Sequence, residues 1–320
     1  MARKSGKQKR LEKKMVMTLC VVAVVAVATI LSSVSPPFAR WLNLVLGITP
    51  KVEVAQTGSD SPTAVHFIDV GQGDAILLEE SGEFALIDAG PPEGKDNLLA
   101  YLDAAGVRKL KYVFMTHPHA DHIGGMQEVV EQINVEKLIL PDFSLAPYPT
   151  ASTVKKLLEA VIKHNIPTET GKENAVYPLG TGSIEIWQAG QETEDNYNIL
   201  SLVTMFEAGG FRFLSTGDAE KQNERALLES GRDLSAQVMK AGHHGSASTS
   251  NTIDFVRAVS PAVVGISCAT GNSYGHPHKK ALEHFEDVGA LVLRTDQDGC
   301  IKVQPDGNGG LAYGITNNKQ

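Results

Sequence analysis

Cysteine is scarce in this chain, which narrows the chemistry of any metal site. The 320 residues include three cysteines, Cys20, Cys268 and Cys300, and none has the spacing of a zinc–thiolate site. Cys20 falls in an apolar run, where cysteine serves as a small apolar residue. Cys268 and Cys300 lie in or beside expected strands. They could pair in an oxidising exterior or remain two buried free thiols.

Positive charge is also scarce once the first fourteen residues are set aside. Those residues carry seven of the 29 Lys and Arg residues and one of the 37 Asp and Glu residues. The remainder therefore has 22 basic and 36 acidic residues, a net charge of −14. Such a domain repels polyanions on average, so any contact with nucleic acid needs a local patch. Phosphodiester hydrolysis is not excluded, because metal ions supply local positive charge.

Long hydrophobic runs are limited to one, near the N-terminus. Residues 16–34 contain no charged side chain, and at ~1.5 Å rise per residue they just cross a ~30 Å hydrocarbon core. We predict a single transmembrane helix over residues 16–34, with the basic residues 1–15 in the cytoplasm and the C-terminal domain outside the cell. The alternative is a cleaved secretory signal, with a weak cleavage site at Pro37-Phe-Ala39. Residues 35–63 are predicted to be a linker.

No repeat of fixed period occurs, and the rest of the chain alternates between strand and helix patterns. Strands are predicted at residues 64–70, 75–79, 84–88, 111–115, 137–140, 183–187, 200–207, 211–215, 236–241, 262–268, 290–294 and 300–303. Helices are predicted at residues 97–105, 125–133, 153–164, 219–229, 253–259 and 279–287. Two β-rich halves with outer helices indicate one αββα sandwich over residues 64–305, with functional loops at one sheet edge. Residues 306–320, rich in Gly and Asn, are predicted to form a flexible tail.

A histidine cluster lies near the middle of the first half. Residues 116–125 read Thr-His-Pro-His-Ala-Asp-His-Ile-Gly-Gly, between a predicted strand and a predicted helix. In an extended segment, alternation places His117 and His119 on one side. The turn into the helix then moves Asp121 and His122 to another side. One loop can thus serve two neighbouring metal ions, a pair that clamps hydrolytic transition states.

This pattern resembles the His-x-His-x-Asp-His signature of the metallo-β-lactamase superfamily of hydrolases. Four more stretches resemble the metallo-hydrolase domain at the C-terminal end of the ComEC competence DNA-uptake family: Phe-Ile-Asp-Val-Gly-Gln-Gly-Asp (67–74), Leu-Ser-Thr-Gly-Asp (214–218), Gly-His-His-Gly-Ser (242–246) and Asn-Ser-Tyr-Gly-His-Pro-His (272–278). The likeness spans about residues 64–304. It implies a four-layer αββα fold and a phosphodiester substrate. The ligands, imidazole and carboxylate without thiolate, suit two divalent ions, Zn²⁺ or Mn²⁺.

The resemblance also implies roles for the remaining ligands. Asp218 would be the carboxylate shared by the two ions, although an Asp before a predicted helix can also be its N-cap. A further ligand should come from the adjacent pair His243 and His244. The sequence leaves that choice open; we expect His243 to bind metal and His244 either to face the substrate or to support a metal ligand from behind. Asp88 looks like the carboxylate that steadies a metal-bound imidazole from behind.

One position departs from the wider superfamily. Its two-metal members usually have another histidine between the cluster and the bridging aspartate. Here the only one is His164, at the end of an amphipathic helix, where a surface role is expected. The stretch Asn198-Ile-Leu-Ser stands at the expected place instead and resembles the competence branch. Because an amide is a weaker ligand than imidazole, the first ion would be held less tightly.

Other residues are candidates for contact with the substrate. His276 is a candidate proton donor to the leaving group, or a phosphate contact. Lys240 could neutralise a phosphoryl oxygen or be an exposed lysine at a strand end. Asp121 and Asn198 complete the predicted catalytic set. Asp74, beside a Gly-Gln-Gly turn, is not expected to be catalytic.

Together these features predict a membrane-anchored, outward-facing, metal-dependent hydrolase of phosphodiesters. Extracellular DNA is the leading substrate, as for a competence-type nuclease with competence or envelope partners. A small phosphodiester or a phosphorylcholine-type ester is the next candidate, because the domain is acidic, and a lactone follows. A protein that binds DNA or a channel partner without cutting it is the alternative from another class.

Overall fold

The computed structural model describes residues 54–55 and 61–316. All of these belong to the unit Val52–Gln320, the second of two into which the chain divides. The predicted transmembrane segment, residues 16–34, lies outside the described residues, as does most of the predicted linker. Within the described part of the chain, no helix combines the length and hydrophobicity that a bilayer span needs.

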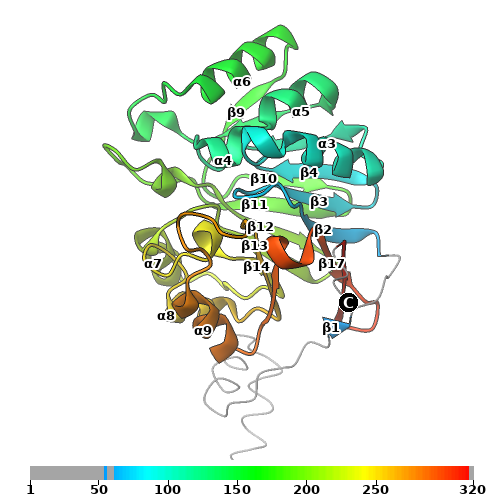
Figure 1. Cartoon of the computed structure of the whole chain (residues 1–320), viewed down its shortest axis with the longest axis vertical. Coiled ribbons are helices and arrows are strands. Elements are labelled where there is room, and N and C mark those ends of the chain that lie inside the picture. Colours follow the sequence, from blue (N-terminus) through cyan, green and yellow to red (C-terminus); the bar gives the residue numbers. More distant parts are fainter. Residues whose placement is uncertain (1–53, 56–60, 317–320) are drawn as a thin grey trace, which may run out of the picture. The chain divides into compact units, whose positions relative to one another are not determined.

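Two large β-sheets form the centre of this unit (Figure 1). The first has nine strands, in the order β1 (Val54–Ala55), β18 (Leu311–Ile315), β17 (Ile301–Pro305), β2 (Thr63–Phe67), β3 (Ile76–Glu80), β4 (Glu83–Ile87), β6 (Tyr112–Phe114), β8 (Leu138–Leu140) and β9 (Thr168–Thr170). The second has seven, in the order β10 (Val176–Leu179), β11 (Gly182–Gln188), β12 (Val203–Ala208), β13 (Phe211–Ser215), β14 (Val238–Lys240), β15 (Val263–Ile266) and β16 (Leu291–Arg294). Strands β5 (Lys109–Leu110) and β7 (Asn134–Val135) form a small third sheet.

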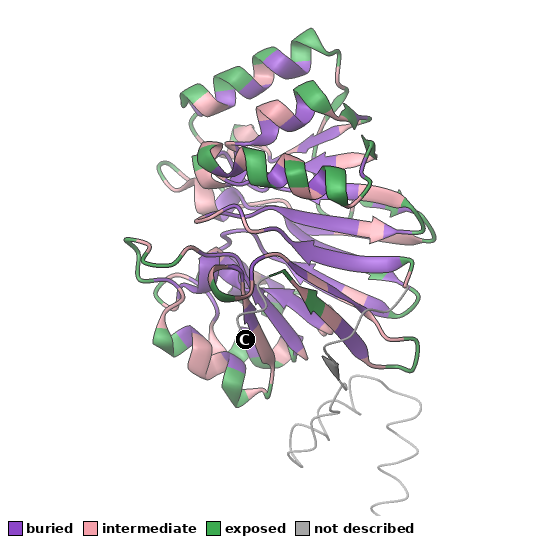
Figure 2. Ribbon diagram, turned by 45° about the vertical axis from the view of Figure 1, so that its right-hand side comes forward, coloured by how far each residue is buried: buried purple, intermediate pink, exposed green. Residues whose placement is uncertain are grey.

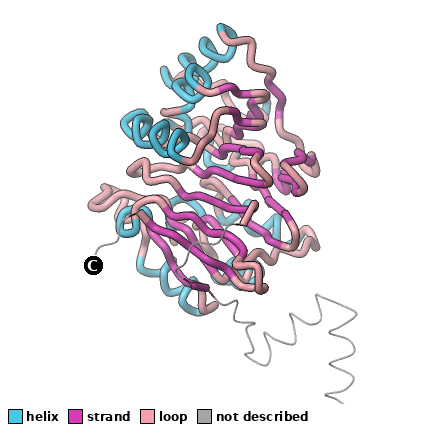
Figure 3. The backbone as a smooth tube through the Cα atoms, turned by 90° about the vertical axis from the view of Figure 1, so that its right-hand side faces the viewer, coloured by secondary structure: helices cyan, strands magenta, loops and turns pink. Residues whose placement is uncertain are grey.

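Helices cover the outer face of each large sheet, as Figures 1 and 3 show. The first sheet is covered by α3 (Lys95–Ala104), α5 (Met126–Gln132) and α6 (Ser152–Lys163), and the second by α7 (Lys221–Glu229), α8 (Ile253–Val259) and α9 (Lys279–Asp287). Shorter helices are α4 (Ala120–Ile123), α10 (Thr295–Asp298), η1 (Pro92–Gly94), η2 (Phe143–Leu145), η3 (Tyr197–Leu200) and η4 (Gly242–Gly245). The predicted four-layer αββα order is confirmed for the described residues.

Strand alternation builds the layers, because successive side chains point to opposite faces of a sheet. On β3, Ile76 and Leu78 face the core between the sheets, whereas Leu77 packs under the helices. The two sheets meet through Phe67 on β2 and Phe213 on β13, whose rings pack edge to face with centroids 5.8 Å apart. Figure 2 shows these strands as a buried interior, with exposed residues on the helices' outer sides.

Parallel pairing explains where the functional loops gather. Strands β4, β6 and β8 run parallel in the first sheet, and β13 to β16 run parallel in the second. The carboxyl ends of parallel strands meet at one sheet edge. Asp88, the histidine cluster, Asp218 and the His243-His244 pair each follow one of these strands. The topology thus brings segments from both halves to the same edge.

The predicted flexible tail is wrong for part of its length. Leu311–Ile315 forms β18, which pairs antiparallel with β17 and parallel with β1. The apolar side chains of Leu311 and Ala312 are buried in the core, which outweighs the turn-like residues before them. Cys268 and Cys300 are both free thiols. The open choice between a disulfide and free thiols is therefore resolved in favour of free thiols.

Phe67→Ala should lower the free energy of unfolding by about 3–5 kcal/mol, because it leaves a cavity between the two sheets. Urea unfolding of the described domain measures this loss. The matched control is Val176→Ala on β10, where the side chain is 56 % exposed and the expected change is within about 0.5 kcal/mol. Equal losses of unfolding free energy in the two variants would contradict the packing of Phe67 between the two sheets.

Candidate metal centre

Asp88 fixes the base of the site, directly after β4. It adopts a left-handed backbone with φ of 58°, an arrangement that costs energy for a residue with a side chain and clusters at functional sites. Its carboxylate accepts hydrogen bonds from the Thr116 backbone N–H at 2.9 Å and the Thr116 hydroxyl at 2.6 Å. It also lies 2.7 Å from Nδ1 of His122. Asp88 therefore orients the His122 ring.

His122 and His244 present the same arrangement from opposite sheets. Nδ1 of His122 is engaged by Asp88, and Nδ1 of His244 lies 3.0 Å from the backbone oxygen of Ser267. Both Nε2 atoms are buried and lack a hydrogen-bond partner. An imidazole whose second nitrogen is held by a carboxylate or carbonyl is oriented for metal binding. These two unpartnered nitrogens fit a divalent ion.

Two carboxylates complete a small polyhedron with these nitrogens. Oδ2 of Asp218 lies 3.3 Å from His122 Nε2 and 3.6 Å from His244 Nε2, and Oδ2 of Asp121 lies 3.9 and 3.4 Å from the same atoms. Ligands at about 2.0–2.1 Å from a tetrahedral ion are separated by roughly 3.3 Å. The distances between these nitrogen and oxygen atoms are therefore close to those between the ligands of one tetrahedral ion. Asp74, His122, Asp218 and His244 also offer ligand atoms that all lie within 4.8 Å of one another, but Asp74 approaches the two imidazoles from their Nδ1 sides, and its Oδ2 is paired with Lys240.

Lys240 is the group that engages Asp74. Its Nζ lies 2.5 Å from Oδ2 of Asp74 and 3.4 Å from Oδ1 of Asp218, and it donates to the Gly217 backbone oxygen at 2.7 Å. The side chain is fully buried, so the alternative of an exposed strand-end lysine is wrong. Because Lys240 holds Oδ1 of Asp218, the other oxygen of that carboxylate is turned towards the histidines.

His117 and His119 form a second group beside the first. Nε2 of His117 and Nδ1 of His119 lie 3.0 Å apart. Nδ1 of His117 faces the hydroxyls of Thr116 and Ser201, at 3.1 and 3.4 Å. The Ser201 hydroxyl also accepts a hydrogen bond from the Asp218 backbone at 3.1 Å. The His117 and Asp218 loops are thus joined through one serine.

Asn198 lies on the same side as His119. The amide Nδ2 of Asn198 donates a hydrogen bond to Glu220 at 3.3 Å. Its Oδ1 is buried without a hydrogen-bond partner. An amide oxygen in that state is available as a ligand, at the place where the superfamily usually has a histidine. Glu220 is the N-cap of α7, so the alternative of Asp218 as that cap is wrong.

The order of the histidine pair differs from the expected one. His243 and His244 both have left-handed backbones, with φ of 48° and 54°, so their side chains diverge. His244 is 2 % exposed and belongs to the buried cluster, whereas the His243 side chain is 21 % exposed, with Nε2 3.5 Å from Asp218. This geometry favours His244 as the ligand and His243 as the residue facing outwards, the reverse of the sequence-based expectation.

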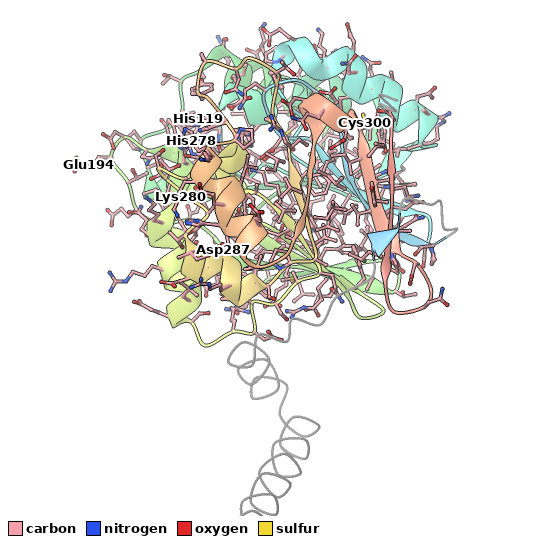
Figure 4. All side chains as sticks on the ribbon, turned by 60° about the horizontal axis from the view of Figure 1, so that its bottom comes forward. His119, Glu194, His278, Lys280, Asp287 and Cys300 are labelled. Atoms are coloured by element: carbon pink, nitrogen blue, oxygen red, sulfur yellow. The ribbon has the colours of Figure 1, made fainter. Side chains whose placement is uncertain are left out.

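His276 reaches the rim of the site. Its ring centroid lies 5.6 Å from that of His243 and 6.4 Å from that of His244. Figure 4 shows its neighbour His278 on the same side of the molecule as His119. Burial, together with nearby His244 and His243, lowers the pKa of His276 to about 4. The imidazole is therefore neutral at pH 7.

The charges of the cluster are strongly unbalanced without metal. Its buried or partly buried carboxylates outnumber its one permanent cation, Lys240; they are Asp74, Asp88, Asp121 and Asp218. Burial alone would lower the pKa of His122, but the surrounding carboxylates, Asp218 first, raise it well above its ordinary value. The same competition raises the pKa of His244 to about 9. Divalent cations would supply the missing positive charge in place of these protons.

The loop that carries His243 and His244 is held by Asn251. Its Oδ1 accepts from the Gly242 N–H at 2.9 Å, and its Nδ2 donates to the backbone oxygens of Gly242 and Ser246 at 2.8 Å each. Glu224, on α7, accepts a hydrogen bond from the Asn251 backbone N–H.

The loop that carries Asp74 passes close to the histidine cluster at Gly73, where an added Cβ would lie 2.2 Å from the Asp121 backbone oxygen. Glycine is therefore required there for Asp74 to reach the cluster.

The structure brings together every residue predicted for the site, although their chemical roles stay predictions. Sequence reasoning missed the part of Asp74, and it missed Ser201 and Asn251 as supports. For Asp74, the available signal was Lys240, because a lysine at the end of an apolar strand needs a buried counter-ion. Ser201 and Asn251 carried no comparable signal, since their roles depend on loops that only the fold brings together.

The sequence matches a known protein family and two named relatives. The model of the metallo-beta-lactamase superfamily matches residues 68–265. The chain is 28 % identical to ComE operon protein 3 of Bacillus subtilis, over 75 % of this chain and 33 % of that protein. It is 28 % identical to competence protein ComA of Neisseria gonorrhoeae, over 76 % of this chain and 32 % of that protein. The chain thus spans about a third of these relatives' length.

Solved structures show the same fold. The metallo-beta-lactamase fold protein YhfI of Bacillus subtilis superimposes with a TM-score of 0.50 at 12 % identity, over 73 % of this chain and 97 % of that one. At this identity the likeness concerns the fold alone. The predicted resemblance to the hydrolase domain of competence proteins is confirmed by the two relatives.

Asn251→Gly should loosen the loop that carries His243 and His244. Glycine tolerates the left-handed backbone of Asn251, φ 58°, so the variant removes three side-chain hydrogen bonds without adding backbone strain. We expect a loss of about 2–3 kcal/mol in the free energy of unfolding and faster hydrogen exchange at residues 242–246. Asn174→Gly, another asparagine with positive φ but far from this loop, is the control. Unchanged hydrogen exchange at residues 242–246 would contradict the inference that Asn251 holds this loop.

Proposed function

This chain belongs to the metallo-β-lactamase superfamily, and we propose that it is a metal-dependent phosphodiesterase whose leading substrate is DNA. The observation that carries the proposal is the pair of buried, unpartnered Nε2 atoms on His122 and His244, facing the Oδ2 atoms of Asp121 and Asp218. One of the two relatives is a competence protein by name, which favours a nucleic-acid substrate.

We assign two ion positions to the chain's own residues. One position takes His117, His119 and Asp218, with the Asn198 amide oxygen in place of a third imidazole. The other takes Asp121, His122, His244 and Asp218, which reverses the expected roles of His243 and His244. Zn²⁺ and Mn²⁺ both accept such imidazole and carboxylate ligands. When bound, divalent ions polarise a phosphoryl oxygen and so stabilise the charge that develops in hydrolysis.

The remaining residues of the site orient a metal ligand or contact the substrate. Lys240 is enclosed by Asp74 and Asp218, so its proposed role is to orient the shared carboxylate rather than to touch a phosphoryl oxygen as expected from the sequence. His276, neutral and at the rim, is assigned to contact a phosphate oxygen through its N–H, because an imidazole with a pKa of about 4 is a poor proton donor to a leaving group. His243 is more exposed than His244 and is assigned to substrate contact.

A small phosphodiester remains the second candidate, favoured by the acidity of the domain. Exposed Glu192, Glu194 and Asp195 precede Asn198 and add negative charge near the site. We further propose that residues 16–34 anchor the enzyme in the cell membrane with this domain outside, where competence or envelope proteins would be its partners.

The decisive assay uses the full-length protein in detergent, stripped of metal and then supplied with Mn²⁺ or Zn²⁺. We expect metal-dependent cleavage of single-stranded DNA and of bis(p-nitrophenyl) phosphate, reduced at least about 1000-fold in Asp121→Ala and Asp218→Ala. Asp103→Ala, an exposed aspartate on α3, is the control and should retain activity. Cleavage of the small diester alone would select the second candidate. A lack of cleavage of both substrates would refute the phosphodiesterase assignment.

The histidine assignment gives a separate prediction. His244→Ala should weaken binding of one Mn²⁺ or Zn²⁺ ion by at least about 10- to 100-fold, because it removes a ligand. His243→Ala should leave metal affinity within about threefold and act on the rate of hydrolysis. Isothermal titration of the metal-free proteins measures both. The opposite order of effects would restore the expectation from the sequence.

A further inference from the structure

Tyr274 is an exposed aromatic residue at the rim of the candidate metal centre. Its side chain is 64 % exposed. One of its faces stacks on the ring of His276, with centroids 5.6 Å apart and an angle of 20° between the planes. His276 in turn contacts both His243 and His244. Tyr274 is therefore two ring contacts away from the buried cluster.

The loop that carries Tyr274 is fixed by Asn272. The Asn272 Oδ1 accepts from the backbone N–H groups of Tyr274 and His276, at 3.2 and 3.0 Å. Its Nδ2 donates to the backbone oxygens of Ala269 and His276, at 2.9 and 2.6 Å. An exposed ring held in place loses little conformational freedom when a ligand covers it. Such a ring is suited to binding a second planar group.

Charge differs between the two sides of the site. Lys279 and Lys280 begin α9, directly after the Tyr274 loop; both are exposed, and they share the single carboxylate of Glu283, at 3.7 and 3.5 Å. The first turn of α9 contains no acidic residue. Figure 4 shows Lys280 on the same side of the molecule as His278 and His119.

The side beyond His119 is acidic. Tyr197 contacts the ring of His119, with centroids 5.9 Å apart, and it follows the exposed residues Glu192, Glu194 and Asp195. Figure 4 shows Glu194 on an outlying loop. A chain of phosphates is thus repelled by residues 192–195 and attracted to the start of α9.

From this placement we propose that Tyr274 is a specificity-determining residue: a base of the nucleic-acid substrate stacks on its free face, and the strand continues over Lys279 and Lys280. The assignment rests on the proposed function and deepens it. Stacking on an aromatic side chain is tolerant of sequence, because every base has a π-face. It gives a strand of nucleotides an advantage over a small diester in an otherwise acidic domain.

The test compares full-length wild type, Tyr274→Phe and Tyr274→Ala on an oligothymidylate with Mn²⁺. We expect Tyr274→Ala to raise KM by roughly 5- to 100-fold with little change in kcat, and Tyr274→Phe to stay within about twofold of wild type. A second substrate carries abasic spacers in place of the bases. On this substrate wild type and Tyr274→Ala should have equal kcat/KM, because the base that Tyr274 would hold is absent.

Tyr148→Ala is the matched control, since the Tyr148 side chain is also exposed, at 62 %. Tyr148 lies on the acidic side of the site, next to Pro147, whose backbone oxygen accepts a hydrogen bond from the Tyr197 hydroxyl. Tyr148→Ala should behave as wild type. The assignment fails if Tyr274→Ala matches wild type on the oligothymidylate, or if it loses the same factor on the abasic strand. In either case cleavage by wild type would leave the phosphodiesterase function intact. If wild type cleaves neither strand, both the function and this assignment fall.

The path of the strand is tested with charge reversal. Lys279→Glu/Lys280→Glu should raise KM for the oligothymidylate and flatten the dependence of log KM on log salt, because two phosphate contacts are lost. Lys155→Glu/Lys156→Glu, an adjacent exposed pair on α6, makes the same change in net charge. Equal effects of the two double variants would indicate general repulsion and overturn the proposed path.

Discussion

The buried ammonium of Lys240 is the contact on which the rest of the site depends. It comes from β14 and reaches Asp74, in the loop after β2, as well as Asp218, in the loop after β13. Two carboxylates this close together would repel each other in a dry interior. With Lys240 between them, one oxygen of Asp218 is fixed and the other faces the imidazoles. Removing one partner of such a buried pair leaves an uncompensated charge, which is costly.

Much of the fold could be predicted because strand and helix periodicities are strong in this chain. The αββα order follows from alternation on strands such as β3 and from the amphipathic pattern of α6. The sequence does not predict the short strands β9 and β10, since Thr168–Thr170 is only three residues long and contains no apolar residue, and Val176–Leu179 contains a proline. Strand β18 was missed because a Gly- and Asn-rich turn precedes it. In each case the pairing partner, rather than local preference, decides the structure.

The site could be predicted as a set of residues but only partly as an arrangement. His117, His119, Asp121 and His122 are adjacent in the sequence, so their grouping needed no tertiary information. The order of His243 and His244 depends on two consecutive left-handed residues, which no sequence pattern indicated. The burial of Lys240 depends on Asp74, which lies 166 positions earlier in the chain. Long-range electrostatic pairing of this kind is invisible to periodicity.

The cluster draws its members from both sheets. Asp88, His117 and His122 follow strands of the first sheet, whereas Asp218 and His244 follow strands of the second. An ion held by His122 and Asp218 would therefore act as a cross-link between the two layers. Since a ligand that binds only the folded state stabilises that state, a chelator would weaken the sandwich as well as the chemistry. Either sheet taken alone would lack part of this cluster.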